Sequence, residues 1–319
     1  MQKLFIITIV YIIWGSASLP NIYRIDPNFV KRMNNLWNTI KPFEVTLVGP
    51  EYGGRASKIP WSGYWWPFLD STYTDNMYDA NGPLDKYDQY AKKVSGQTSN
   101  AVQLEKSGTS YPMGPHYTTN PSESWFGHCN GLAAAGVLEP EPKSPKTKQG
   151  ITFTVGDQKG LMTEAHWYDN VDLWQPVSGT TLEAHVFHKT LIDWIGKGKE
   201  AVIMDVSFGP VKNNHPISVY KMQYETDAND PSKTHVTCMV WGSNYAPKDF
   251  VGTEKKPCES WPNPYGKTYY YWISGSISNP TNGGWEKGCE TDHPDFIWHP
   301  LYFPSNYIVK DQWVKDILS

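Results

Sequence analysis

The order of helical and strand-like patterns in the second half of the chain constrains its fold most strongly. Residues 182–195 are amphipathic, with Phe187 and Ile195 on one apolar face, and Gly196 ends the pattern. A continuous apolar run at 201–206 predicts a buried strand. Three further strands are expected, at residues 217–224, 235–241 and 268–273. A helix followed by successive strands is typical of the α+β class, which we therefore predict.

The remaining helical patterns are shorter and lie on both sides of this region. Helices are expected at residues 28–40, 84–93, 129–138 and 311–318. The helix at 129–138 should end at the Glu139-Pro-Glu-Pro142 segment, because proline cannot continue a helix.

The first twenty residues have the pattern of a secretory signal peptide. Lys3 precedes an apolar run at 4–14, and the small residues at 15–17 offer a cleavage site. This apolar run is too short to cross about 30 Å of hydrocarbon, so a membrane anchor is not expected. We predict a signal peptide at 1–19 and a secreted protein, extracellular or periplasmic, that does not associate with a membrane after cleavage.

The composition excludes several classes of protein. The chain holds 28 Lys and Arg against 32 Asp and Glu, so a basic nucleic-acid-binding protein is not expected. Aromatic residues make up 14% of the chain, which excludes a disordered protein. Such an aromatic content fits either a binding cleft or a core built largely from loops.

Export changes the interpretation of the four cysteines. Cys258 and Cys289 lie in polar segments and could form a disulfide in an oxidising compartment. Cys238 lies in a strand-like run and is expected to be a small buried apolar residue. No CxxC pair is present, so a structural zinc site is not expected and no residue is assigned as a metal ligand.

Cys129 carries the strongest chemical signal because it stands at the start of the predicted helix 129–138. The unpaired N–H groups and the dipole at a helix N-terminus favour an anion, and the thiolate is the nucleophilic form of cysteine. The same N–H groups could hold the oxyanion of a tetrahedral intermediate. We therefore predict that Cys129 is a nucleophile.

A cysteine nucleophile needs a base, and two histidines are placed to provide one. His215 precedes a predicted strand, and Asn244 could orient its ring. His188 lies on the apolar face of the helix at 182–195, and Asp205 on the following strand could orient it. The residue pattern alone leaves both pairs open.

Several motifs, in order along most of the chain, resemble the transglutaminase elicitor family of secreted oomycete and bacterial enzymes. The matching segments are Pro60-Trp-Ser-Gly-Tyr-Trp-Trp-Pro67, Gly82-Pro-Leu-Asp-Lys-Tyr87, Trp125-Phe-Gly-His-Cys-Asn-Gly-Leu-Ala-Ala-Ala135 with Glu139-Pro-Glu-Pro142, Phe187-His188, Asp205, Asn214-His-Pro-Ile217, Gly283-Gly-Trp285 and His293-Pro-Asp-Phe-Ile-Trp298. The resemblance implies that Cys129 is the nucleophile of protein-glutamine γ-glutamyl transfer, and that calcium is a possible cofactor. Some family members have Gln at the position of His215. This favours His188 as the catalytic base, with Asp205 as the residue that orients it.

From the residues and this resemblance together, we predict a secreted cysteine acyltransferase that joins glutamine side chains to lysine or other primary amines through a Cys129 thioester. Its protein partners would be the glutamine donor and the amine acceptor. The nucleophile-bearing helix would pack on an antiparallel sheet in a papain-like or transglutaminase-like core, within a catalytic domain at 56–319 that follows an N-terminal lead-in or pro-segment at 20–55. Trp65, Trp66 and Trp125 are candidates for the substrate cleft. The alternatives are a cysteine peptidase, amidase or glutamine deamidase, in which water is the acceptor, and a non-enzymatic aromatic-rich binding module.

Overall fold

The computed structural model describes residues 49–108, 114–176, 181–206, 208–252, 264–302 and 306–319, which all belong to one compact unit, 47–319. The predicted signal peptide, the predicted helix at 28–40 and Cys258 lie outside the described residues. Within the described part of the chain, no helix is both long and apolar enough to cross a membrane.

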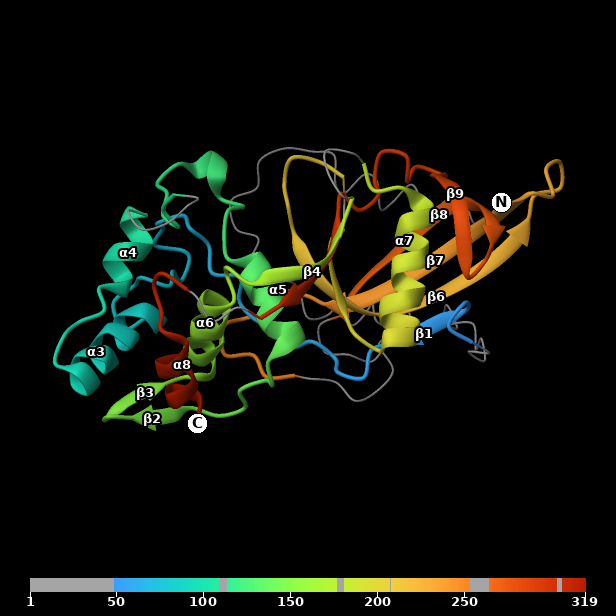
Figure 1. The fold of residues 1–319 in the computed structure, drawn as a ribbon. Helices are drawn as coiled ribbons and strands as arrows, with labels where there is room; N and C mark the ends of the chain where they lie inside the picture. Colours follow the sequence, from blue (N-terminus) through green and yellow to red (C-terminus); the bar gives the residue numbers. More distant parts are fainter. Residues whose placement is uncertain (1–48, 109–113, 177–180, 207, 253–263, 303–305) are drawn as a thin grey trace, which may run out of the picture. The chain divides into compact units, whose positions relative to one another are not determined.

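The main sheet of this unit is antiparallel (Figure 1). Its strand order is β4-β10-β5-β6-β7-β8-β9, and β1 pairs with β6 beside this path. The strands are β1 (Gly53–Arg55), β4 (Asn170–Gln175), β5 (Val202–Asp205), β6 (Asn214–Thr226), β7 (Lys233–Ser243), β8 (Pro264–Ser276), β9 (Asn279–Trp285) and β10 (Ile297–Leu301). The four strands predicted from the sequence correspond to β5 to β8. Residues 53–55, which the sequence analysis placed in the lead-in, pair with β6 as β1.

The helices lie on the sheet and beside it. They are α3 (Pro83–Ser95), α4 (Ala101–Ser107), α5 (Cys129–Leu138), α6 (Val155–Ala165), α7 (Ala184–Thr190) and α8 (Asp311–Leu318), with the 3₁₀ turn η1 (Pro121–Glu123) and a small hairpin of β2 (Lys146–Lys148) and β3 (Ile151–Phe153). The predictions at 129–138 and 311–318 match α5 and α8, and α3 contains the prediction at 84–93. The predicted helix at 182–195 is α7 followed by a π-helix, η2 (Leu191–Gly198). The α+β prediction is confirmed.

The apolar face of α7 and η2 covers one side of the sheet. Phe187 and Leu191 lie in one buried cluster with Val202 of β5 and with Tyr269 and Tyr271 of β8. Figure 1 shows α7 running across strands β6 to β9. This packing explains the amphipathic pattern found in the sequence, because the stripe of apolar side chains meets the sheet.

The helix α5 lies between the sheet and α6, where small side chains allow close packing. Ala133 and Ala134 contact Ile203 of β5 and Trp298 of β10. On the other side, a Cβ at Gly131 would lie 2.2 Å from the carbonyl oxygen of Thr163 in α6. Glycine is therefore required there, and α5 is held tightly between two layers.

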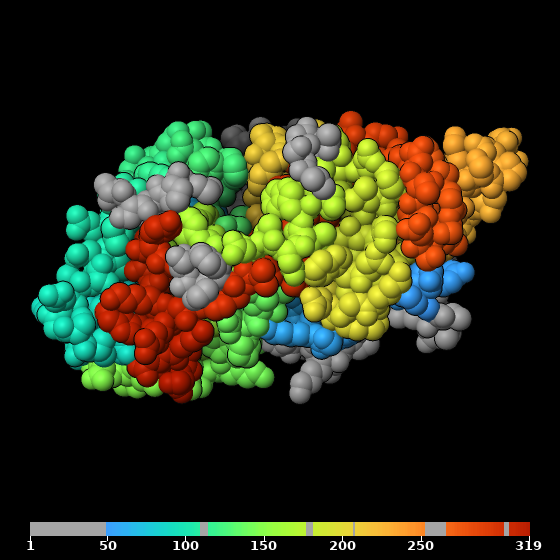
Figure 2. All heavy atoms as spheres, viewed as in Figure 1, coloured from blue at the N-terminus to red at the C-terminus, as the bar shows by residue number. Residues whose placement is uncertain are grey.

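Every residue of α6 is buried. The helix begins with a capping box, in which Thr154 and Asp157 each accept a hydrogen bond from the other's backbone N–H. Figure 2 shows the C-terminal segment with α8, in red, lying over the region where Figure 1 places α6. The second large cluster forms here, joining α6 to α3 and α8 through Leu84, Leu161 and Ile317.

Candidate functional site

Cys129 is the first residue of α5, as the sequence predicts, and its side chain is half-buried. The first hydrogen bond of the helix runs from the N–H of Leu132 to the carbonyl oxygen of His128 at 2.9 Å. The N–H groups of residues 129–131 therefore have no acceptor inside the helix, since an α-helix leaves its first N–H groups unpaired. The sulfur is thus next to the positive end of the helix dipole.

The sulfur of Cys129 faces polar groups from β6 and from the segment after β7. Asn214 Nδ2 donates to Sγ at 3.5 Å, and Sγ lies 3.7 Å from the carbonyl oxygen of Lys212. Burial raises the pKa of Tyr245 well above its usual value, and the charge and hydrogen bond of Cys129 raise it further. Tyr245 is therefore a neutral phenol beside the sulfur.

The orientation of the Asn214 amide is set by Trp298 of β10. Trp298 Nε1 donates to Asn214 Oδ1 at 2.9 Å. An indole N–H is a donor only, so the oxygen must face Trp298 and the NH₂ group must face Cys129. Asn214 therefore presents a fixed N–H donor to the sulfur of Cys129.

Asp205 is fully buried and pairs with Asn214 in the register of β5 and β6. Its Oδ1 accepts the backbone N–H of Asn213 at 3.0 Å, and its Oδ2 lies 3.7 Å from Lys212 Nζ. Asp205 thus holds the 212–214 segment that meets the sulfur. The structure brings Asp205 to the Cys129 region, although not as the partner of His188.

His215 follows Asn214 directly, and its ring packs against Tyr245 at a tilt of 33°, with the centroids 4.7 Å apart. Burial lowers the pKa of His215 to about 4, so the ring is neutral at pH 7. Its Nδ1 lies 3.4 Å from the carbonyl oxygen of Ser243. Asn244, the predicted orienting residue, instead accepts the N–H of Tyr245 with its side-chain oxygen at 2.9 Å. The Ser243 carbonyl therefore stands where the side chain of Asn244 was expected.

The predicted pairing of His188 with Asp205 is wrong. Both ring nitrogens of His188 are engaged in the core between α7 and β8, where Nδ1 lies 2.9 Å from the Tyr271 hydroxyl and Nε2 lies 2.8 Å from the Ile277 carbonyl oxygen. The ring is fully buried. Helical periodicity placed His188 on the apolar face correctly, but that face meets β8 and not the α5 N-terminus.

The position of His188 predicts a loss of stability in mild acid. Burial lowers its pKa to about 4, whereas the unfolded chain titrates near 6.5, so protons bind the unfolded state first as the pH falls. The contribution of His188 to the free energy of unfolding is complete above about pH 6.5. It should fall by about 2 kcal/mol between pH 7 and pH 5. Urea unfolding of His188→Gln at both pH values should therefore show a weaker pH dependence than the wild type. His215→Gln, whose histidine also has a pKa of about 4, should give a reduction of similar size; an unchanged pH dependence in both variants would contradict the assignment.

The three predicted cleft tryptophans differ in position. Trp66 is only 2% exposed and packs in the cluster around α6, so its predicted role in substrate binding is wrong. Trp65 is half-buried, and its ring covers Gly127, where a Cβ would lie 2.2 Å from a ring carbon. Its ring centroid is 6.3 Å from that of Tyr245, which places Trp65 beside the sulfur site. Trp125 is half-buried and packs edge-on against Phe126.

The other described cysteines are distant from this chemistry. Cys238 of β7 is fully buried, as predicted, and burial raises the pKa of its thiol. Among the described residues Cys289 has no disulfide partner, and its sulfur accepts the backbone N–H of Tyr270 at 3.3 Å. The disulfide considered for Cys289 has its other cysteine, Cys258, outside the described residues.

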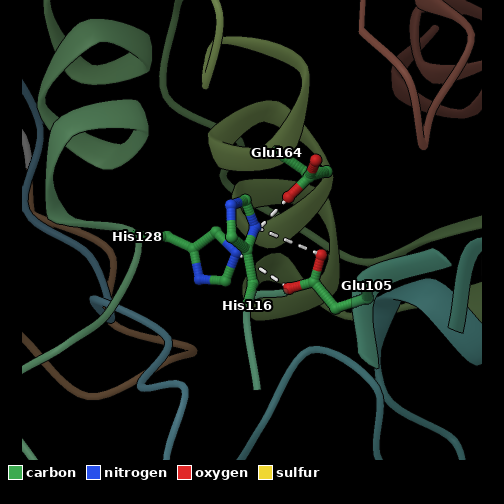
Figure 3. A group of neighbouring side chains, drawn as sticks. All are labelled: Glu105, His116, His128 and Glu164. Carbon is green, nitrogen blue, oxygen red and sulfur yellow. Dashed lines mark ion pairs between the residues drawn. The ribbon is translucent and has the colours of Figure 1, made fainter. Parts of the chain in front are cut away.

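A second polar group includes His128, the residue directly before Cys129 (Figure 3). Glu105, His116, His128 and Glu164 are all buried, and each offers a nitrogen or oxygen atom within 4.8 Å of those of the others. Burial alone would raise the pKa of Glu105, but the charges and hydrogen bonds of His128 and His116 lower it. Burial would likewise lower the pKa of His128, but Glu105 and Glu164 raise it. Calcium, the cofactor that the family resemblance implies, prefers oxygen ligands, so this group with its two imidazoles does not fit it.

Sequence reasoning missed Asn214, Tyr245 and this buried group. Asn214 stands in the Asn214-His-Pro motif, but only its neighbour His215 was considered as a functional residue. The members of the buried group come from four separate segments, so no local spacing could have connected them. The absence of a CxxC pair excludes thiolate zinc sites alone, whereas this group consists of histidines and glutamates.

Comparison with known proteins finds one matching family and one similar crystal structure. The sequence model of the transglutaminase elicitor family matches residues 116–180, which include Cys129. No curated protein matches the sequence. The crystal structure of the GP42 transglutaminase from Phytophthora sojae is similar with a TM-score of 0.61 and 19% sequence identity, over 84% of this chain and 90% of that chain. The resemblance to the transglutaminase elicitor family is thereby confirmed, in sequence at residues 116–180 and in fold by the similarity to the GP42 transglutaminase.

Proposed function

We propose that the protein is a secreted cysteine acyltransferase that joins glutamine side chains to primary amines. The observation that carries the proposal is the position of the Cys129 sulfur, at the start of a buried helix and 3.5 Å from Asn214 Nδ2, inside the region that matches the family. A half-buried thiol among N–H donors is suited to nucleophilic attack on a carbonyl carbon.

In the proposed reaction, the Cys129 thiolate attacks the carboxamide carbon of a glutamine side chain. The N–H groups at the start of α5 and Asn214 Nδ2 would hold the oxyanion of the tetrahedral intermediate. A proton passes to the departing nitrogen, ammonia leaves, and a thioester remains on the sulfur. A lysine amine then attacks the thioester, so that the C–S bond breaks, an isopeptide bond forms and the thiol is restored.

We propose His215 as the base, in place of the preference for His188. The neutral ring of His215 is the form that accepts a proton, and Nδ1 facing the Ser243 carbonyl leaves the lone pair on Nε2. His215 also contacts Tyr245, which itself hydrogen-bonds Cys129. A helix-borne cysteine packed on an antiparallel sheet, with a histidine at the start of a strand, supports a papain-like or transglutaminase-like core.

The choice between amine and water as acceptor depends on the walls around the sulfur. Excluding water from the thioester favours the amine. We propose that Trp65 forms one wall, because its half-buried ring lies over Gly127 and beside Tyr245. Trp125, half-buried on the loop before α5, is a second candidate. The proposed partners are proteins that supply a glutamine and an amine.

The test is incubation of the mature protein with a glutamine-rich protein and a fluorescent primary amine. Covalent incorporation of the label supports transfer. Release of ammonia without incorporation would instead indicate a deamidase, and peptide fragments would indicate a peptidase. A binding module without chemistry predicts that Cys129 is slow to react with iodoacetamide at neutral pH, whereas a thiolate at the helix start should be alkylated quickly.

The choice of base gives a separate prediction. His215→Ala should lower amine incorporation by about 10²- to 10⁴-fold, the usual contribution of a general base. His188→Ala should lower stability but keep activity within several-fold per folded molecule, because its ring lies in the core of α7 and β8. Initial rates, normalised to the folded fraction measured by circular dichroism, compare the two variants. A folded His215→Ala variant with full activity would overturn the assignment.

A further inference from the structure

Four segments of the chain meet at the buried group formed by Glu105, His116, His128 and Glu164. Glu105 comes from α4, His116 from the following loop, His128 from the N-cap of α5 and Glu164 from the last turn of α6. Figure 3 shows the two rings and the two carboxylates converging from these separate elements. Their exposed fractions are all 2% or less. A convergence of this kind needs a reason, because burying four polar side chains together is costly.

The distances within the group are close to those between the ligands of one metal ion. His128 Nε2 lies 2.9 Å from Glu105 Oε1 and 3.4 Å from Glu164 Oε2, and His116 Nδ1 lies 3.4 Å from Glu105 Oε2. Tetrahedral zinc has Zn–N and Zn–O bonds of about 2.0–2.2 Å, which places neighbouring ligand atoms about 3.4 Å apart. The group therefore needs only small side-chain movements to surround such an ion.

The outer contacts of the group are those of a metal site. His128 Nδ1 lies 2.7 Å from the carbonyl oxygen of Trp66 and can donate to it, which directs Nε2 toward the carboxylates. Metal-binding histidines usually donate their second ring N–H to a carbonyl or a carboxylate in this way. The ring of Phe68 stacks on His116 at 4.7 Å and meets His128 edge-on at 4.8 Å. Trp167 also packs against both rings, so the site has a dry aromatic wall.

The charges of the group favour a divalent cation. Two ionised carboxylates carry a charge of −2, which one divalent ion cancels while both imidazoles stay neutral. Without a metal ion, this charge has to be balanced by protons shared among two carboxylates and two imidazole rings, whose centroids are 5.0 Å apart. Imidazole nitrogen with carboxylate oxygen suits zinc and related transition metals, whereas calcium and magnesium prefer oxygen alone.

We propose that Glu105, His116, His128 and Glu164 bind one zinc or similar first-row divalent ion, which fixes the start of α5 one residue before Cys129. All four positions are taken by protein ligands, so the ion has a structural role. The test of this site does not depend on the proposed transfer chemistry, because the experiment measures bound metal and not activity.

The experiment measures zinc in the purified full-length protein by mass spectrometry, after removal of metal with a chelator and dialysis against zinc. About one zinc per chain is expected for the wild type, and His116→Gln should bind zinc at least tenfold more weakly. His166→Gln is the matched control and should keep the zinc, because His166 is also buried between two carboxylates, Asp169 and Glu139, but lies outside the group. Cys129→Ser should also keep it.

Two results would overturn the proposal. One is a wild-type protein that binds no zinc, which would leave an ion-paired group that holds protons only. The other is zinc lost in Cys129→Ser but kept in His116→Gln, which would place the metal on the nucleophile. If His116→Gln does not fold, cobalt bound to the wild type still decides: nitrogen and oxygen ligands give no thiolate-to-cobalt charge-transfer band, and such a band would contradict the site.

Discussion

Cys129→Ala should lower amine incorporation by at least about 1,000-fold, because removing a covalent nucleophile leaves only binding and oxyanion stabilisation. The fold should tolerate the change well. The sulfur is half-buried and makes long contacts, at 3.5 Å to Asn214 Nδ2 and 3.7 Å to the Lys212 carbonyl oxygen. Activity should therefore be lost without a comparable loss in the free energy of unfolding. Initial rates of label incorporation and urea unfolding, measured on the same preparation, test both parts.

The matched control for this variant is Cys238→Ala, which removes a thiol of the same size from the fully buried interior of β7. It should destabilise the protein while each folded molecule keeps its activity. If Cys129→Ala stays active, or if the two variants lose activity equally, Cys129 is not the nucleophile.

Lys159→Met should lower the free energy of unfolding by about 3–5 kcal/mol, the usual effect of removing one partner from a buried ion pair. Lys159 is fully buried in α6, and burial lowers its pKa while Glu141 opposes that shift. Its Nζ donates to the carbonyl oxygens of Ser62 at 2.6 Å and Phe250 at 2.7 Å, and to Glu141 Oε1 at 2.8 Å. These three bonds use all three protons of the ammonium group. The variant leaves a buried carboxylate and two carbonyl groups without this donor.

Urea unfolding of Lys159→Met beside Lys189→Met tests the size of the effect. Lys189 pairs with Asp193 on the surface, with side chains 44% and 34% exposed, so its loss should cost less than about 1 kcal/mol. Adding Glu141→Gln to Lys159→Met should recover part of the loss, because the unbalanced charge is then removed. Equal effects of the two lysine variants would show that the buried bonds contribute little.

The parts of the fold that could be predicted are those with a regular apolar pattern. The helix bounds at 129–138 and 311–318 match α5 and α8, and the apolar runs match β5 to β8. The helix α6 could not be predicted, because its buried polar residues Gln158, Lys159 and Glu164 interrupt any apolar period. Lys159 and Glu164 are compatible with a buried helix only because distant segments supply their partners, whereas Gln158 donates to nearby carbonyl groups, among them those of Phe153 and Thr154. The strand β9 was missed as well, since Asn-Gly-Gly at 282–284 is typical of a turn.

For the candidate site, local sequence was sufficient to place Cys129 at a helix start and insufficient to identify its neighbours. The position of a cysteine at a helix start depends on adjacent residues, which the sequence displays. The choice between His188 and His215 depends on which side of the sheet each element covers, and this follows from strand order and register. Asn214 reaches the sulfur because β6 pairs with β5 at Asp205 and Trp298 of β10 fixes its amide. No periodicity within one segment carries that information.

The separation along the chain of the groups around the sulfur has a consequence for folding. Cys129 and Asn214 are 85 residues apart, and Tyr245 follows only after β7. Contacts between residues so distant form late, because closing long loops costs entropy before any contact compensates for it. A partly folded chain can contain α5 while its thiol still has neither the amide of Asn214 nor the phenol of Tyr245 beside it. The polar surroundings of Cys129, the proposed nucleophile, are therefore complete only when β5, β6 and β7 have assembled.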